Sequence, residues 1–282
     1  MSLAVLEAAK FAKMLAAHRL TTNDLGPNSD LFIGTSARDT FNGGAGNDTV
    51  SYSTSTAGIN LTLTQNSSPV GGFAAGDTLL GIENAIGTNF RDVLSGDDRA
   101  NVLVGLGGDD SIYGNGGADR LYGDSGNDTV ANFGLSGVHT YLDGGAGNDT
   151  IVYTTSGGTA EITTGTENDL VKVRISDSQD FRVVITDFQP YWENVFGVVT
   201  EAESFRGDRI SLLFNESFDA SLDALSTYQQ IISGDDLILH FQNGAVNGDL
   251  VFQDIGQWLD LNVNNGFSFY LNVGNYTEYL AV

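Results

Sequence analysis

The chain has 282 residues, 41% of them hydrophobic, so it is long enough and apolar enough to bury a core. Its 36 acidic residues against 12 Lys and Arg give a formal charge of −24, which repels nucleic acid and anionic lipid or polysaccharide unless cations intervene. The absence of cysteine excludes disulfides and zinc–thiolate sites and leaves metals that bind oxygen ligands. A metal cation is therefore the partner that the composition favours.

The first twenty residues predict a helix, because their apolar positions follow a helical period. We expect this helix, within residues 1–24, to cover an open end of the core; dimerisation and membrane contact are the alternatives. Charged residues interrupt its apolar positions, so it lacks the apolar core of a signal peptide. No run of about 18 apolar residues occurs elsewhere, so we expect no stable membrane insertion.

A repeat with a period of nine residues begins shortly afterwards. Two consecutive units cover residues 34–51, five cover 87–131, and two more lie at 144–152 and, less regularly, at 165–172. The regular units begin with Gly, carry Asp or Asn at position six and place an apolar residue near position eight. The position-six residues are Asp39, Asp48, Asp92, Asn101, Asp110, Asp119, Asp128 and Asp149, and Asp169 takes the corresponding role in the less regular last unit.

Nine residues suit a six-residue turn followed by a three-residue strand with one inward side chain. Two units then make one coil, which predicts an all-β fold, a parallel β-roll with two sheets over residues 25–172. Residues eighteen positions apart should stack, placing Asp92, Asp110 and Asp128 on one edge, and Asn101 with Asp119 on the other. The longer spacings to Asp149 and Asp169 indicate enlarged coils on the first edge.

Two segments depart from the repeat. Residues 52–86 predict a coil with an inserted loop near 65–76, because an alternating strand precedes a polar excursion and the coil rhythm then returns. After residue 172 glycine becomes sparse and apolar runs appear at 182–188, 236–241 and 249–252. Residues 173–282 are therefore expected to form a β-rich cap on the open end of the roll.

The turn composition predicts calcium binding. Glycine permits a positive φ and lets carbonyl oxygens approach a shared centre, to which the position-six residue adds a carboxylate. Ca²⁺ takes six to eight hard oxygen ligands in a flexible geometry, whereas Mg²⁺ needs a tighter octahedron. Besides the position-six residues, the predicted metal-site residues are Gly44, Gly46, Gly105, Gly107, Gly114, Gly116, Gly123, Gly145 and Gly147. The alternative, a metal-free solenoid whose Asp and Asn only cap turns, does not require a carboxylate at the same position in nearly every repeat.

These units resemble the G-G-x-G-x-D-x-U-x repeat of the RTX (repeats-in-toxin, haemolysin-type calcium-binding) family over roughly residues 30–172. Asn101 departs from the carboxylate, and residues 34–37 keep only one of the motif's three glycines, so weaker or empty sites are expected in those two repeats. Residues 184–189 and 207–212 resemble parts of the cap that follows the repeats in serralysin-type exoproteins.

The resemblance also implies export by type I secretion machinery that reads an uncleaved C-terminal signal, and an extracellular location. The acidic and apolar ending after Glu278, with no Lys or Arg after Arg209, agrees with this; an ordinary acidic final strand is the alternative.

No catalytic motif accompanies the repeats. The three histidines, His18, His139 and His240, lack zinc-protease spacing, and the G-x-S-x-G motif of lipases is absent. Residues 123–126 read Gly-Asp-Ser-Gly but lie in the repeat register. We therefore predict a secreted calcium-binding protein that is not an enzyme. The alternatives are a C-terminal module of a protease, lipase or epimerase type of exoenzyme, or a module that binds extracellular glycan.

Overall fold

A computed structural model describes residues 28–64, 67–135, 137–175, 180–187, 209–214, 228–233, 236–243, 246–253, 268–273 and 276–281. The predicted N-terminal helix of residues 1–24 lies outside the described residues. The chain divides into two compact units, Met1–Asp128 and Thr129–Val282. Apart from a single 3-10 turn at Gly72–Ala74, the described elements of both units are β-strands. The predicted all-β class is therefore confirmed.

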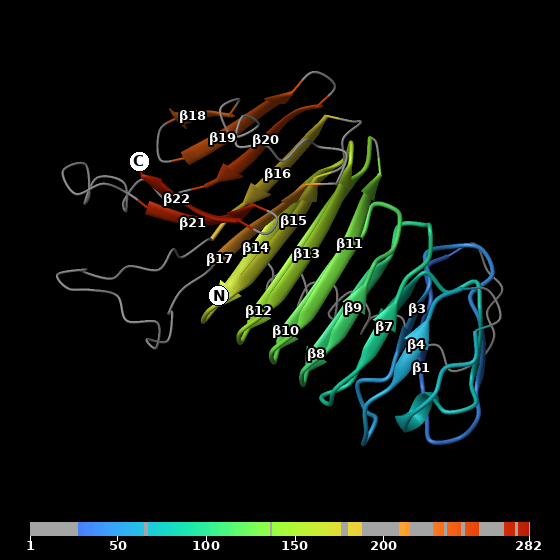
Figure 1. Cartoon of the computed structure of the whole chain (residues 1–282). Coiled ribbons are helices and arrows are strands. Elements are labelled where there is room, and N and C mark those ends of the chain that lie inside the picture. The colour runs from blue at the N-terminus through green and yellow to red at the C-terminus, as the bar shows by residue number, and fades with distance from the viewer. Residues whose placement is uncertain are drawn as a thin grey trace. The chain divides into compact units, whose positions relative to one another are not determined.

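The first unit is built from short parallel strands whose coils stack on one another (Figure 1). One sheet has the order β1 (Leu31–Ile33), β3 (Thr49–Ser51), β6 (Asn84–Ile86), β8 (Val102–Gly107) and β10 (Arg120–Ser125). The second sheet has the order β4 (Asn60–Thr62), β7 (Val93–Ser95) and β9 (Ser111–Tyr113). A small parallel pair joins β2 (Thr40–Asn42) to β5 (Thr78–Leu80). From β7 to β10 successive nonapeptides alternate between the two larger sheets, which confirms the predicted parallel β-roll.

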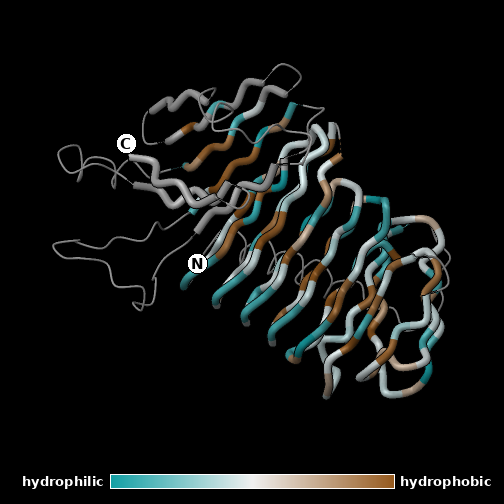
Figure 2. The backbone as a smooth tube through the Cα atoms, viewed as in Figure 1, coloured by the Kyte–Doolittle hydropathy of each residue, from teal (hydrophilic) through white to brown (hydrophobic). Residues whose placement is uncertain are grey.

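Each short strand contributes one inward apolar side chain, because alternate residues of a strand point to opposite faces. Leu121 lies opposite Leu103 in one sheet, and Ile112 lies opposite Leu94 in the other. These four side chains are 0% exposed. The strand centres are accordingly hydrophobic and the turns hydrophilic (Figure 2). Burying one such side chain contributes about 1.5–3 kcal/mol.

The stretch between β3 and β6 makes an excursion from the coil. Isolated antiparallel bridges join Asn60 to Val70 and Ser67 to Leu79. Tyr52 is fully buried, and its hydroxyl donates a hydrogen bond to Asp77 Oδ2 at 2.9 Å. The segment then resumes parallel pairing at β5 and β6, so Glu83 enters the stack next to Asp48.

The second unit has longer strands. One sheet has the order β11 (Thr129–Leu135), β13 (Thr150–Ser156), β15 (Leu170–Ile175), β17 (Arg209–Phe214) and β21 (Ser268–Val273), followed by antiparallel β22 (Tyr276–Ala281). The other has the order β12 (His139–Ala146), β14 (Thr159–Thr166), β16 (Phe181–Ile185) and β20 (Val246–Phe252), followed by antiparallel β19 (Asp236–Asn243) and β18 (Tyr228–Ser233). Parallel pairing thus extends well beyond the nonapeptides. No helix in the described part of the chain is long and apolar enough to cross a membrane.

Candidate calcium sites

The position-six carboxylates form buried stacks at the coil edges. Asp92 N donates to Asp110 Oδ1 and Asp110 N donates to Asp128 Oδ1, both at 2.7 Å and both across 18 residues. On the other edge Asn101 N donates to Asp119 Oδ1 at 2.8 Å. The predicted eighteen-residue stacking is therefore confirmed within the first unit, where all five residues are at most 2% exposed.

The second unit contains an enlarged coil of the same kind. Asp149 N donates to Asp169 Oδ1 at 2.8 Å across 20 residues, and both carboxylates are buried. A methyl group on Gly144 would meet the carbonyl oxygen of Thr164 at 2.6 Å and Asp149 Oδ2 at 2.5 Å. This turn therefore brings a carboxylate and a carbonyl of the next coil together.

One carboxylate oxygen in two of the first unit's turns has no hydrogen-bond partner. Asp48 Oδ2 and Asp110 Oδ2 are buried and unpaired, whereas the Oδ1 atom of each accepts a backbone hydrogen bond. A methyl group on Gly105 would collide with Asp110 Oδ2 and lie 2.8 Å from the carbonyl oxygen of Gly123. Burying a carboxylate oxygen without a partner is costly, and a cation bound between carboxylate and carbonyl would remove that cost. The oxygen ligands present thus fit Ca²⁺.

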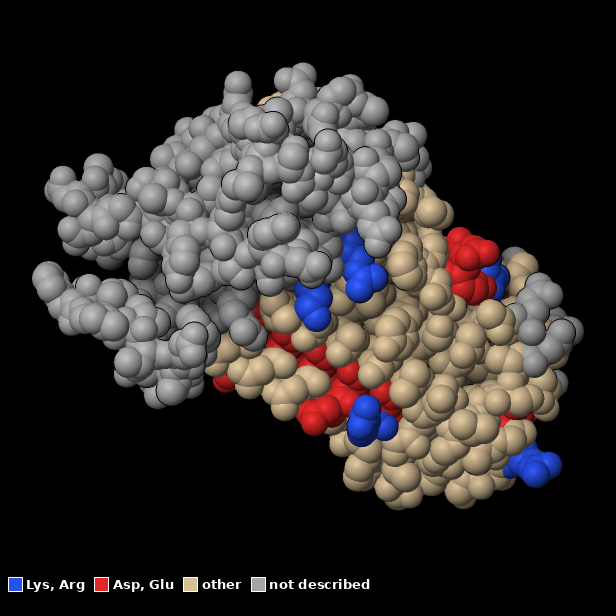
Figure 3. All heavy atoms as spheres, viewed as in Figure 1, with Lys and Arg blue, Asp and Glu red and all other residues tan. Residues whose placement is uncertain are grey.

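The pKa values of these carboxylates reflect their burial. Burial, followed by the charges of Asp92 and Asp128, raises the pKa of Asp110 to about 8. Burial also raises the pKa of Asp48 and of Asp128 to about 6. Figure 3 shows how acidic side chains gather in a band on the described surface. Without a cation Asp110 therefore resists ionisation at neutral pH, whereas Asp48 and Asp128 ionise at a higher pH than free carboxyl groups do.

The turn glycines differ in what their positions require. Gly46 has a φ of 150°, and a side chain there would run into the carbonyl of Asn28. Gly44, Gly145 and Gly147 also have positive φ, as do three position-four glycines that the sequence analysis did not select: Gly108, Gly117 and Gly126. Gly107 has nothing nearer than 3.7 Å to an added methyl group, so the backbone there does not require glycine.

The remaining predicted glycines have other placements. The carbonyl oxygens of Gly105, Gly114 and Gly123 face the first glycine of the preceding coil on the same edge. Gly116 is buried within its turn.

Two predicted carboxylates are engaged by protein donors instead. Thr88 donates to Asp92 through its backbone N–H to Oδ2 at 2.6 Å and through its hydroxyl to Oδ1 at 3.0 Å. Thr35 donates its backbone N–H and its hydroxyl to one oxygen of Asp39, Oδ2, at 3.0 and 2.8 Å. Both repeats begin Gly-Thr and lack glycine at position four. A threonine at position two thus supplies donors where a cation would otherwise be needed.

Sequence reasoning missed three acidic residues of the stacks. Asp30 N donates to Asp48 Oδ1 at 2.8 Å, Asp39 N to Asp77 Oδ1 at 2.8 Å, and Asp48 N to Glu83 Oε2 at 2.9 Å. Counting back nine residues from Asp39 would have found Asp30.

Carboxylates alone do not complete a metal centre in this protein. In the part of the chain that the structure describes, no three His, Asp or Glu side chains converge as a metal-binding cluster. The other oxygens that these turns offer are backbone carbonyls, such as that of Gly123 beside Asp110 Oδ2.

Short parallel strands joined by Gly/Asp turns, with buried carboxylates stacked coil upon coil, define a parallel β-solenoid whose turns offer oxygen ligands. A family model of the RTX calcium-binding nonapeptide repeat matches four copies, at residues 25–53, 95–130 and 141–153. The repeats at these residues are therefore RTX calcium-binding nonapeptide repeats. No curated protein matched the chain in a separate search. The expected likeness of residues 184–189 and 207–212 to the serralysin cap lies outside the matched residues.

Proposed function

We propose that this chain binds several Ca²⁺ ions in the turns of its coils and folds on binding them outside the cell, with a structural, secretion or cell-surface role. The ligands are carbonyl oxygens of the turns together with the position-six carboxylates, of which Asp48, Asp110, Asp119, Asp128, Asp149 and Asp169 lie in buried stacks. The observation that carries the proposal is the unpaired, buried Oδ2 of Asp110 beside the Gly123 carbonyl.

Electrostatics couples calcium to folding. Two carboxylates on coils about 4.8 Å apart repel by roughly 3–4 kcal/mol at an effective dielectric constant near 20. A site that sees Ca²⁺ at about ten times its dissociation constant gains roughly 1.4 kcal/mol, so five sites gain about 7 kcal/mol. That sum is comparable with the net stability of a domain. The roll is therefore largely unfolded where calcium is scarce and folded where it is plentiful.

This coupling suits export. A chain that stays unfolded in the cytosol can pass through type I secretion machinery and fold in extracellular calcium. The net charge of −24 and the absence of cysteine are compatible with stability that depends on metal instead of disulfides. The RTX roll is a structural calcium-binding fold, and the proposal assigns it no catalytic role.

The test is a calcium titration of chelator-treated protein followed by far-UV circular dichroism. We expect a disordered spectrum in EGTA and a cooperative gain of β-structure with Ca²⁺, with Mg²⁺ at equal concentration much less effective. A spectrum that is already rich in β-structure in EGTA and does not change with calcium would refute the proposal.

A further inference from the structure

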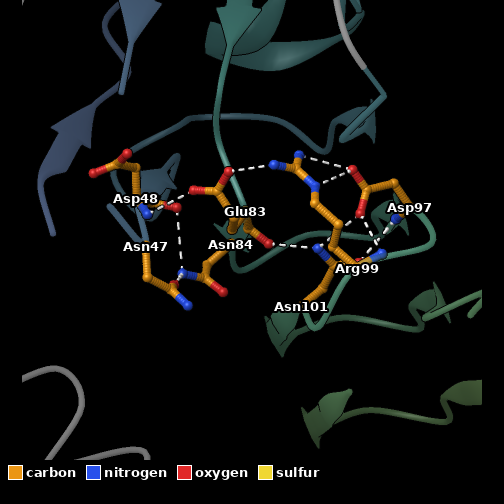
Figure 4. A network of polar contacts seen from close by, with 7 residues as sticks. All are labelled: Asn47, Asp48, Glu83, Asn84, Asp97, Arg99 and Asn101. Atoms are coloured by element: carbon orange, nitrogen blue, oxygen red, sulfur yellow. Dashed lines mark hydrogen bonds and ion pairs between the residues drawn. The ribbon is translucent and has the colours of Figure 1, made fainter. Parts of the chain in front are cut away.

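One turn of the first unit has a different arrangement from the others. Asn84 lies opposite both Thr49 and Val102, so the residues just before them, Asp48, Glu83 and Asn101, occupy successive levels of one edge. At the level between Glu83 and Asn101 the two neighbouring turns are joined by the side chain of Arg99 (Figure 4).

Arg99 places its guanidinium between two carboxylates from adjacent coils. Its Nη1 contacts Glu83 Oε1 at 2.6 Å, and its Nη2 contacts Asp97 Oδ2 at 2.8 Å. Nε also donates to Asp97 Oδ2 at 2.9 Å. The Glu83 and Asp97 side chains are only 12% and 16% exposed, so the bridge is partly shielded from solvent. Such charge-assisted bonds are stronger than neutral ones.

The Asn101 side chain makes hydrogen bonds to both neighbouring acidic residues. Its Nδ2 donates to the Glu83 carbonyl at 2.8 Å, while its Oδ1 accepts from Asp97 N at 2.8 Å. Glu83 Oε2 accepts from Asp48 N. These oxygens have protein donors, in contrast to the unpaired Oδ2 of Asp110.

This turn departs from the repeat at two positions that bear on a bound metal ion. Arg99 stands at position four, where the next three repeats carry Gly108, Gly117 and Gly126, and Asn101 stands at position six in place of Asp. The Asn101 amide has no negative charge to attract a metal ion, and the positive charge of Arg99 repels one. Together these two side chains supply hydrogen-bond donors in place of the metal ion.

We infer that the guanidinium of Arg99 takes the place of a calcium ion between the Glu83 and Asn101 levels, so that the turn at residues 96–101 is closed without metal. The inference rests on the proposed function for the other turns. In the folded first unit this turn is therefore independent of calcium occupancy, unlike the turn at Asp110.

The first experiment restores the metal-binding pattern. The double variant Arg99→Gly with Asn101→Asp gives this repeat glycine at position four and aspartate at position six. We expect native mass spectrometry of the calcium-saturated full chain to count one more Ca²⁺ than in the wild type. An unchanged count in a variant whose circular dichroism matches the wild type would overturn the inference.

A second measurement does not depend on the double variant. Arg99→Gln should lower the unfolding midpoint of the calcium-saturated protein, whereas Arg91→Gln, at an exposed arginine of the preceding repeat, should leave it unchanged. Equal midpoints for Arg99→Gln and the wild type would overturn the inference. If the wild type binds no calcium while Arg99→Gln still lowers the midpoint, the proposed function fails and the arginine bridge stands.

Discussion

Replacing Asp110 by Asn should change stability in opposite directions with and without calcium. Asp110 Oδ1 accepts the Asp92 N–H, and an Asn Oδ1 can accept the same bond, so the coil keeps this contact. What changes is the charge and the metal ligand. In EGTA the variant no longer holds a buried carboxyl group, and in calcium it lacks the oxygen that the proposed ion binds.

The magnitude follows from the pKa. At pH 7 the Asp110 carboxyl is ionised in the unfolded chain, where its pKa is 3.8, but protonated in the fold, where burial raises its pKa to about 8. The difference between pH 7 and 3.8 is about three pH units, and at about 1.4 kcal/mol per unit the fold loses up to about 4 kcal/mol of stability. Asp110→Asn should recover this free energy in EGTA. At Ca²⁺ ten times above the dissociation constant, each lost site should instead cost about 1.4 kcal/mol.

The assay is far-UV circular dichroism: in EGTA the variant should show more β-structure than the wild type, and in saturating calcium its urea unfolding midpoint should be lower. Asp98→Asn is the matched control, because it removes the same charge from an exposed residue of a neighbouring repeat and should change stability by less than about 0.5 kcal/mol. If Asp110→Asn destabilises the fold equally under both conditions, the carboxylate is only a hydrogen-bond acceptor and the reasoning is refuted.

Two further predictions concern pH and the turn glycines. Burial raises the pKa values of Asp48, Asp110 and Asp128, so the stability that these groups give the metal-free fold is fully present below about pH 3.8 and is lost as the pH rises through about 6 to 8. Acidifying EGTA-treated protein from pH 8 to 5 should therefore increase its circular dichroism signal for β-structure. A decrease would contradict this prediction. Gly108 has a φ of 105°, and a methyl group added there would lie 2.5 Å from the backbone of Phe90. Gly108→Ala should therefore lower the free energy of urea unfolding in calcium by more than about 2 kcal/mol, whereas Gly107→Ala should lower it by less than about 0.5 kcal/mol. Equal losses would show that the turn does not constrain these positions.

The repeat predicts much of the fold because its period fixes the register. Once nine residues make half a coil, the opposition of Leu103 and Leu121 follows from counting, as does the hydrogen bond between Asp92 and Asp110. Counting fails at the segment between β3 and β6, whose excursion has no repeat length. For that reason the placement of Glu83 beside Asp48 depends on the three-dimensional structure.

The candidate sites could be predicted only in part, since the sequence gives residue types but not the direction of donors. Thr88 and Asp92 stand at positions two and six of an ordinary repeat, and only the structure shows that the threonine donates to both carboxylate oxygens. Asn101 was recognised as a departure, but the role of Arg99 depends on a carboxylate, Glu83, that belongs to another coil.

The first unit therefore contains turns of two kinds, and their order along the chain bears on how it folds. Thr88 and Arg99 close two successive turns with protein donors, whereas the next turn on the first edge leaves Asp110 Oδ2 unpaired. Adding one coil buries two apolar side chains, worth about 3–6 kcal/mol together, against a repulsion of roughly 3–4 kcal/mol for each pair of ionised carboxylates. Apolar burial and charge repulsion are therefore of similar size. If the proposed function holds, the turns at residues 87–101 form without bound metal, and stacking of the coils at residues 105–128 on them depends on calcium.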